Sequence, residues 1–249
     1  MKLNFLVAPD FAPERFAGWH MLNTVLQRRS GIHLHLLTPA DATEQTLLLS
    51  QQQVDLIYAN PFDATDMIQS QGFVPFARPR QHYDEMVIST AAGNGLLKVE
   101  DLKPGCRIAI TPNKDVKLIG LRLLEPADLN DTLIEWVPVE SYQAAARLVI
   151  KGEVQAAFFL ADAYASLTRL TRNQLQVLME SRISDISHVV LAHPRMDAEL
   201  PRISEALLGM GSQPSDAAVL DALGLARGFE SMSREDADFM IDLMDTLLD

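Results

Sequence analysis

The sequence is poor in cysteine and in basic residues. Its 249 residues include one cysteine, Cys106, so no disulfide can form within the chain and no cysteine-based metal site can be assembled. Lysine and arginine number 21 against 33 aspartates and glutamates, which gives a net charge of −12 at pH 7. Binding to nucleic acid requires a basic surface that displaces counterions, so this composition argues against a nucleic-acid partner.

Long apolar runs are also absent. No segment approaches the roughly 20 apolar residues of a membrane-spanning helix. The apolar run at residues 3–8 is short and contains Asn4, which is typical of a first strand rather than of a secretion signal. We therefore expect no membrane insertion and a cytoplasmic location, or a periplasmic one if a signal peptide has been removed.

Recognisable catalytic and cofactor motifs are missing as well. The sequence has no G-x-S-x-G nucleophile motif, no P-loop and no G-x-G-x-x-G phosphate-binding loop. His33 and His35 share one face of a predicted strand, but no further metal ligands stand near them in the sequence. We predict no cofactor, no metal site and no catalytic residue.

The sequence does contain alternating strand-like and helix-like segments. In the first block the predicted strands are 3–8, 32–37, 54–59, 73–77 and 85–91, and the helices are 14–29, 42–52 and 62–71. In the second block the strands are 107–111, 134–139 and 155–159, and the helices are 115–125, 141–150 and 162–170. A strand at 187–192 and a helical tail at 197–248 follow, with stops near Gly211 and Gly228. This order predicts an α/β fold with mostly parallel sheets flanked by helices.

Five segments carry a resemblance to a known family. They are A-P-D-F-A-P-E at 8–14, D-L-I-Y-A-N-P-F-D-A at 55–64, G-F-V-P-F-A-R-P at 72–79, V-I-K-G-E-V-Q-A-A at 149–157 and L-G-L-A-R-G-F at 223–229. With them the chain resembles the phosphate, phosphite and phosphonate-binding proteins of ABC transporters. The resemblance implies the two-lobed type II periplasmic-binding-protein fold, with two crossover strands near 86–91 and 187–192 and a small solute bound in the interlobe cleft. The expected lobes are residues 1–88 with 190–249, and residues 89–189.

One part of the family pattern is changed in this sequence. The family holds its anionic head group with a Ser-Thr-Ser run at the start of a second-lobe helix, and the matching segment here is Thr111-Pro112-Asn113-Lys114-Asp115. Lys114 could supply positive charge there, while Asp115 works against an anion. We expect an anionic or zwitterionic solute that differs from the family's own. The predicted ligand contacts are Asp10, Phe11, Tyr58, Asn60, Pro61, Tyr83, Thr111, Asn113, Lys114, Tyr142 and Phe159.

Three functions are compatible with these residues. The first is solute binding or sensing without catalysis, with a signalling or transporter component as protein partner. The second is a cytosolic enzyme on the same fold that acts on a small carboxylated metabolite, for which Asp10, Lys114 and Asp115 are the candidate acids and bases. The third is a protein-interaction module that has lost ligand binding, its cleft filled by side chains such as Phe159.

Overall fold

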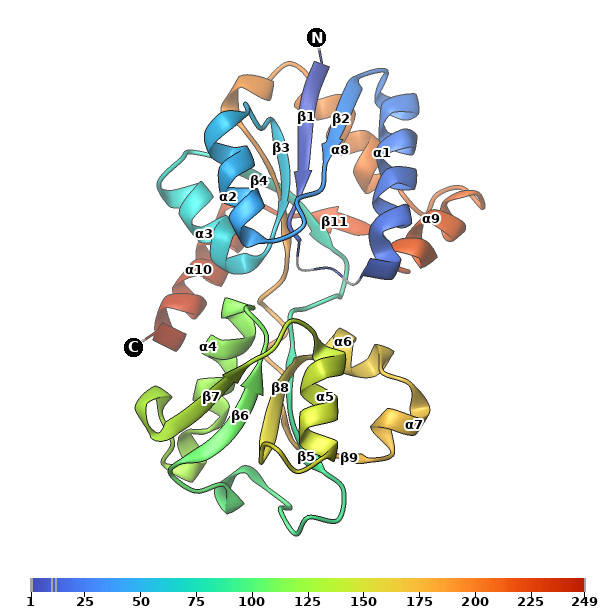
Figure 1. The fold of residues 1–249 in the computed structure, drawn as a ribbon. Helices are drawn as coiled ribbons and strands as arrows, with labels where there is room; N and C mark the ends of the chain where they lie inside the picture. Colours follow the sequence, from blue (N-terminus) through green and yellow to red (C-terminus); the bar gives the residue numbers. More distant parts are fainter. Residues whose placement is uncertain (1, 10, 12, 249) are drawn as a thin grey trace. The chain divides into compact units, whose positions relative to one another are not determined.

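The chain divides into two compact units in the computed structural model, which describes residues 2–9, 11 and 13–248 (Figure 1). Unit 1 comprises Met1–Tyr83 and Asp185–Met244, and unit 2 comprises Asp84–Ser184 and Asp245–Asp249. No helix in the described part of the chain is long and apolar enough to cross a membrane.

Unit 1 is built on a six-stranded mixed sheet in the order β11-β4-β10-β3-β1-β2. Its strands are β1 (Lys2–Val7), β2 (His33–Leu37), β3 (Leu56–Ala59), β4 (Val74–Pro79), β10 (Val189–Ala192) and β11 (Phe229–Ser231). Strand β1 is parallel to β2 and β3, whereas β10 is antiparallel to β3 and β4, and β11 is antiparallel to β4. The parallel strands are those that follow one another through helices, which is the connection that parallel pairing requires.

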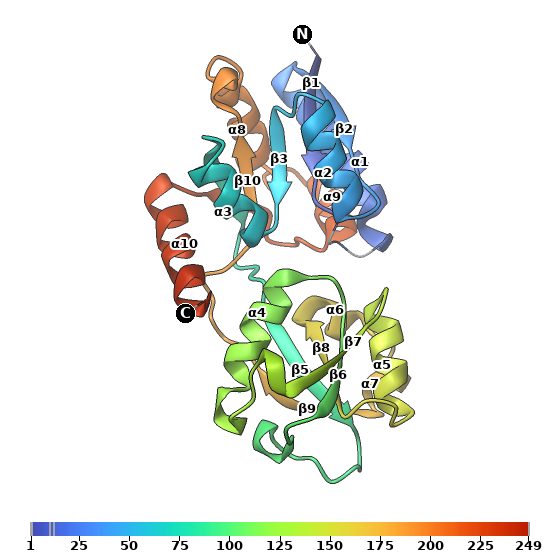
Figure 2. The same ribbon diagram turned by 60° about the vertical axis from the view of Figure 1, so that its left-hand side comes forward.

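Helices cover both faces of this sheet. They are α1 (Phe16–Ser30), α2 (Ala42–Gln51), α3 (Pro61–Gln69), α8 (Leu200–Leu208), α9 (Asp216–Leu223) and α10 (Arg234–Leu248). Alternation along β1 sends Phe5 into a core with α1, α8 and α9, and sends Leu6 into a second core with α3 and α10. Figures 1 and 2 show α1 beside α9, and Figure 2 shows α3 beside α10.

Unit 2 is built on a five-stranded mixed sheet in the order β7-β6-β8-β5-β9. Its strands are β5 (Met86–Ala91), β6 (Cys106–Ile110), β7 (Ile134–Pro138), β8 (Ala156–Leu160) and β9 (Leu175–Glu180), and its helices are α4 (Lys114–Leu123), α5 (Tyr142–Ile150), α6 (Ala161–Ser166) and α7 (Arg169–Arg172). Strand β6 is parallel to β7 and β8, and β5 is antiparallel to β8 and β9. Short 3-10 turns lie at Pro13–Arg15, Val99–Asp101, Glu125–Ala127, Asp131–Leu133 and Pro194–Met196.

The chain passes from one unit to the other outside the strands. Strand β5 lies wholly in the sheet of unit 2 and β10 wholly in that of unit 1, although both were expected to be crossover strands. Glu85, just before β5, accepts hydrogen bonds from the hydroxyl of Ser181 and from the backbone N–H of Ser184 (2.8 Å). These bonds tie the outgoing and returning segments together within unit 2. The predicted lobes, residues 1–88 with 190–249 and residues 89–189, stay a prediction.

Three details differ from the sequence prediction. Each sheet is mixed rather than mostly parallel, because β5 and β10 run against their neighbours. The predicted helix at 162–170 is two helices, since Leu167 and Thr168 are extended (ψ 146° and 149°) and Thr168 caps α7 through the N–H of Thr171. The predicted helical tail is interrupted by β11, and β9 was not predicted.

Candidate functional site

The carboxyl ends of three parallel strands share one edge of the unit 1 sheet. Strand β1 lies between β2 and β3 and is parallel to both, so the loops that leave these strands begin at the same edge (Figure 1). Open α/β sheets bind ligands outside the carboxyl ends of their strands. The predicted contact Phe11 lies in the segment after β1, and Asn60 and Pro61 directly follow β3 at the start of α3. The predicted contact Asp10 lies outside the described residues.

An aromatic group lies at this edge of unit 1. The ring of Tyr58, on β3, stacks on His188 with centroids 4.8 Å apart and lies 4.6 Å from the ring of Trp19. Phe11 lies 6.0 Å from Trp19 on another side. Tyr58 is only 5% exposed, and within the described chain the buried Nε1 of Trp19 meets no hydrogen-bond partner. His188 and Trp19 were not among the predicted contacts, because they come from segments far from Tyr58 in the sequence.

Helix α3 begins directly after β3 with a side-chain cap. The Oδ1 atom of Asn60 accepts a hydrogen bond from the backbone N–H of Asp63 (2.8 Å), and Pro61 occupies the first helical turn. The carboxylate of Asp63 accepts hydrogen bonds from the amides of Asn60 (3.2 Å) and Gln45 (2.6 Å). Asn60 therefore organises the start of the helix, whatever else it contacts.

The corresponding edge of unit 2 contains five of the predicted contacts. Thr111 follows β6 directly, is 8% exposed, and its Oγ1 has no hydrogen-bond partner among the described residues. Asn113 caps α4, its Oδ1 accepting from the N–H of Val116 (3.0 Å). In the first turn of α4, Lys114 is exposed and Asp115 is buried.

Helix α5 begins at the same edge, after β7. Ser141 caps it by accepting from the N–H of Ala144 (3.2 Å), and Tyr142 is its first residue. The half-buried ring of Tyr142 stacks on Phe159 at 6.0 Å, and Phe159 also meets Tyr164 edge-on at 5.4 Å. Phe159 is fully buried in the core of unit 2, so it supports the position of Tyr142.

The structure thus divides the predicted contacts between the units. Phe11, Tyr58, Asn60 and Pro61 gather at one edge of unit 1, and Thr111, Asn113, Lys114, Tyr142 and Phe159 gather at one edge of unit 2. Tyr83 is the half-buried last residue of the first segment of unit 1.

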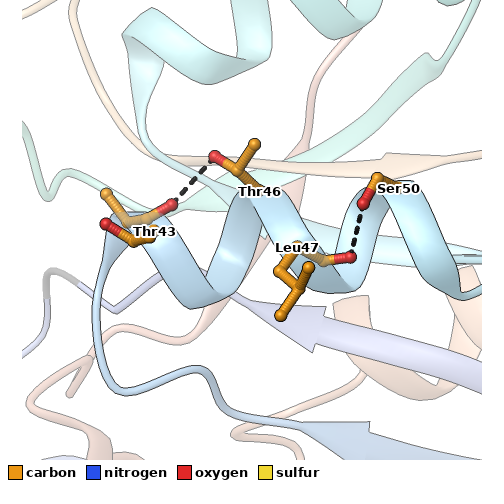
Figure 3. A pocket seen from close by; sticks show the side chains of 5 residues that line it. Thr43, Thr46, Leu47 and Ser50 are labelled. Atoms are coloured by element: carbon orange, nitrogen blue, oxygen red, sulfur yellow. Dashed lines mark hydrogen bonds between the residues drawn. The ribbon is translucent and has the colours of Figure 1, made fainter.

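Two further observations bear on possible sites for a metal or a ligand in the described chain. Within the described residues, no group of three or more His, Cys, Asp or Glu side chains could hold a metal ion. One open hollow, of about 560 Å³, lies on α2, where Ala42, Thr43, Thr46, Leu47 and Ser50 line it (Figure 3). The hydroxyls of Thr46 and Ser50 are bonded to backbone carbonyls of Ala42 and Leu47 (2.9 and 2.8 Å), so they are already satisfied within the helix.

Comparison with known protein families matches most of the chain to one family. The sequence pattern of the family described as "ABC transporter, phosphonate, periplasmic substrate-binding protein" matches residues 5–237. No curated protein matches the sequence at a significant level.

Solved structures resemble the chain over nearly its full length. PhnD1 of Prochlorococcus marinus, solved with methylphosphonate, has a TM-score of 0.81 at 13% identity, with 99% of this chain and 98% of that chain covered. A binding protein component of an ABC phosphonate transporter from Pseudomonas aeruginosa has a TM-score of 0.77 at 13% identity, with 100% and 89% covered. A Xanthomonas citri protein bound to ATP has a TM-score of 0.75 at 15% identity, with 99% and 98% covered. These likenesses confirm the predicted type II periplasmic-binding-protein fold.

Proposed function

The chain belongs to the phosphonate-binding family of periplasmic substrate-binding proteins of ABC transporters, and from this we propose that it binds a small solute without catalysing a reaction. The observation that carries the proposal is the match to the family over residues 5–237. Supporting it, the carboxyl edge of each unit presents aromatic side chains next to capped helix starts, which is where α/β sheets take ligands.

We propose that this protein holds its solute differently from family members that bind an anionic head group through a run of hydroxyl side chains. At the start of α4 the side chains are Asn113, Lys114 and Asp115, and Thr111 is the nearby hydroxyl. The oxygen of Asn113 already accepts the N–H of Val116, so that donor is used within the helix. Unit 2 is then proposed to recognise the solute through Thr111, through the charged side chains of Lys114 and Asp115, and through Tyr142.

Ligand screening tests this proposal. We expect at least one compound from a panel of phosphonates, amino acids, amines, carboxylates and nucleotides to raise the melting temperature and to give a saturable heat in calorimetry. A ligand at 100 times its Kd stabilises the folded state by about 2.7 kcal/mol. If no compound in the panel binds at millimolar concentration, solute binding is wrong.

A matched pair of variants locates the binding surface. Tyr142→Ala removes a ring at the edge of unit 2, and Trp136→Ala removes a ring from β7 that packs edge-on against Phe158 in the same unit. We expect Tyr142→Ala to weaken binding at least tenfold and Trp136→Ala to leave affinity within about twofold, with melting curves run on both. Equal losses of affinity would place the solute elsewhere.

The cellular role is a separate part of the proposal. We propose that the protein senses its solute in the cytoplasm and passes the signal to a protein partner, a signalling or transporter component. Fractionation of native cells, followed by crosslinking with and without ligand, tests both statements. Recovery in the periplasmic fraction would contradict the cytoplasmic role and leave solute binding intact.

A further inference from the structure

Strand β9 forms one edge of the unit 2 sheet, where β5 is its only neighbour among the described strands. An edge strand presents unpaired backbone N–H and C=O groups, which can pair with a strand of another chain. Natural sheets suppress such pairing with prolines and charges, and the opposite edge has both, because β7 ends at Pro138 and carries the exposed Glu135. Residues 173–179 contain neither a proline nor a charged side chain. The edge at β9 is therefore the less protected one.

Two hydrogen bonds fix the direction of the backbone at the start of β9. The carbonyl oxygen of Gln174 accepts from the N–H of Ala92 at 2.9 Å. The carbonyl oxygen of Gln176 accepts from the hydroxyl of Ser89 at 3.0 Å. Ser89 belongs to β5 and Ala92 directly follows it, so the carbonyl groups of Gln174 and Gln176 both face β5.

The two alternate residues of this stretch face the other way. Backbone direction alternates along an antiparallel pair of strands, so the N–H and C=O groups of Leu175 and Val177 point away from β5, out of the sheet edge. The register between β5 and β9 shifts after Val177. The regular stretch that another strand can extend is therefore 174–177, directly after α7.

Helix α7, which precedes this stretch, is basic and carries an exposed leucine. Arg169 and Arg172 are exposed, and Leu170 is 75% exposed. The N–H of Gln174 donates to the carbonyl of Thr171 at 3.0 Å, which holds α7 against the start of β9. The described part of the chain offers neither arginine a carboxylate partner. On a chain with a net charge of −12, this positive surface beside a free strand edge favours an acidic partner.

We propose that residues 174–177 dock an extended acidic segment of a protein partner, which adds to the unit 2 sheet as a further strand beside β9. Backbone hydrogen bonds to Leu175 and Val177 supply affinity, while Arg169 and Arg172 select acidic side chains. A second copy of this chain is a poorer occupant, because symmetric pairing of two β9 strands would bring two basic α7 helices into one interface. The inference rests on the part of the proposed function that names a protein partner, and it is independent of solute binding.

A matched pair of synthetic peptides tests this surface on the full chain. Both peptides have blocked ends and a core of alternating threonine and valine. One carries two glutamates at each end, and the other carries two lysines at each end. In NMR titrations we expect the acidic peptide to shift the amide signals of residues 169–177 and to bind at least tenfold more tightly than the lysine peptide. Raising the salt from about 50 mM to about 500 mM should reduce this difference, because exposed charges are then screened.

The outcomes of the titrations separate this inference from solute binding. Equal binding of the two peptides would overturn the inference, and so would amide shifts confined to other parts of the chain. Failure of the acidic peptide to bind at millimolar concentration would also overturn it. None of these results bears on solute binding, which the calorimetric panel decides separately.

A proline variant distinguishes strand addition from simple attraction between charges. Val177→Pro removes an N–H that faces away from β5, and proline is tolerated at such positions of edge strands. Val177→Thr keeps that N–H and the branched shape of the side chain. We expect Val177→Pro to weaken binding of the acidic peptide at least tenfold and Val177→Thr to leave it within about twofold, with melting curves run on both. Equal affinities in the two variants would contradict strand addition.

Charge reversal at an exposed position tests the role of α7 even if the proline variant does not fold. We expect Arg172→Glu to weaken binding of the acidic peptide at least fivefold and to strengthen binding of the lysine peptide. Arg227→Glu, at an exposed position of unit 1, is the matched control and should change neither affinity by more than about twofold. Equal effects of the two reversals would contradict the proposed surface.

Sedimentation of the chain without peptide tests the alternative occupant. We expect a monomer at this edge, with the same sedimentation for the wild-type chain and for Val177→Pro. A dimer that Val177→Pro dissociates would identify a second copy of this chain as the strand that pairs with β9, and would overturn the inference.

Discussion

Asp216 shows how a single residue holds the first turn of a helix and the preceding loop together. Its carboxylate, in a residue that is 1% exposed, accepts the N–H groups of Gly211 (2.9 Å) and Gln213 (3.2 Å) and the guanidinium of Arg29 (2.6 Å). Burial alone would raise the pKa of Asp216, but the backbone hydrogen bonds and Arg29 outweigh it and lower the pKa below its ordinary value. Removing the carboxylate therefore takes the acceptor from two backbone N–H groups and from the guanidinium of Arg29.

We predict that Asp216→Ala lowers the free energy of unfolding by about 3 kcal/mol, because a buried ion pair loses one partner. Since the folded pKa is depressed, the stabilisation by Asp216 is fully present above the ordinary value near 4 and is lost as pH falls through the folded pKa. Urea unfolding between pH 7 and pH 3 measures both effects. The control, Asp238→Asn, breaks an exposed pair with Arg234 and should change the unfolding free energy by less than about 0.5 kcal/mol. Similar losses in the two variants would contradict this account.

For individual residues, helix caps were easier to predict from the sequence than contacts between aromatic rings. Asn60 followed by proline is a recognisable start for a helix, and Asn60 does cap α3. The ring contacts of Tyr58 with His188 and Trp19 join three segments separated by more than 35 residues. No local pattern encodes such a contact, because it depends on which strands pair. Its part in binding stays a prediction, as do the other predicted contacts.

At the scale of elements, α1 and α9 approach so closely that only glycine fits at one position. A Cβ atom on Gly18 would lie 2.7 Å from the carbonyl carbon of Ala222 and 2.8 Å from its oxygen. Backbone atoms cannot rotate away as a flexible side chain can, so the two helices would have to separate. This contact helps to enclose the core of unit 1 that includes Trp19 and Leu223.

We predict that Gly18→Ala lowers the free energy of unfolding by about 1–3 kcal/mol, the cost of overpacking. The sign of this change is informative. Alanine is favoured over glycine in a helix by about 1 kcal/mol, so the same substitution at a position with free space around it would raise the free energy of unfolding. Ala17→Ser, at an exposed position of the same helix, should change it by less than about 0.5 kcal/mol. Denaturant unfolding followed by circular dichroism measures these differences. A stabilised Gly18→Ala protein would show that α9 can move without cost.

Elements with a clear local pattern were predicted, whereas β9 and β11 were missed. The segments that became α1 and β5 have a clear period or a continuous apolar run, and both were predicted within two residues at each end. Strand β11 has three residues and exists because Phe229, Glu230 and Ser231 pair with β4, about 150 positions earlier. Three residues carry no measurable period, so only the long-range pairing makes that segment a strand.

For the whole molecule, each unit has its own sheet and its own core, and unit 2 consists mainly of one continuous segment. We predict that residues 84–184 expressed alone fold cooperatively. Residues 89–189 should be less stable, because that boundary removes Met86, Val87 and Ile88 from β5, which lies between β8 and β9. Urea unfolding and dispersion of amide signals in NMR spectra compare the two fragments. Equal stability would favour the lobe boundaries expected from the sequence.

The sequence by itself determined the α/β class, the family and the positions of most strands and helices, because these depend on local periodicity and on segments such as D-L-I-Y-A-N-P-F-D-A. The single cysteine and the net charge of −12 also followed directly from the composition. The tertiary structure decided that both sheets are mixed, that Phe159 is buried and stacks on Tyr142, and that Thr111 and Asp115 are both buried. Strand direction and side-chain burial depend on partners far along the chain, and local sequence carries no information about those partners.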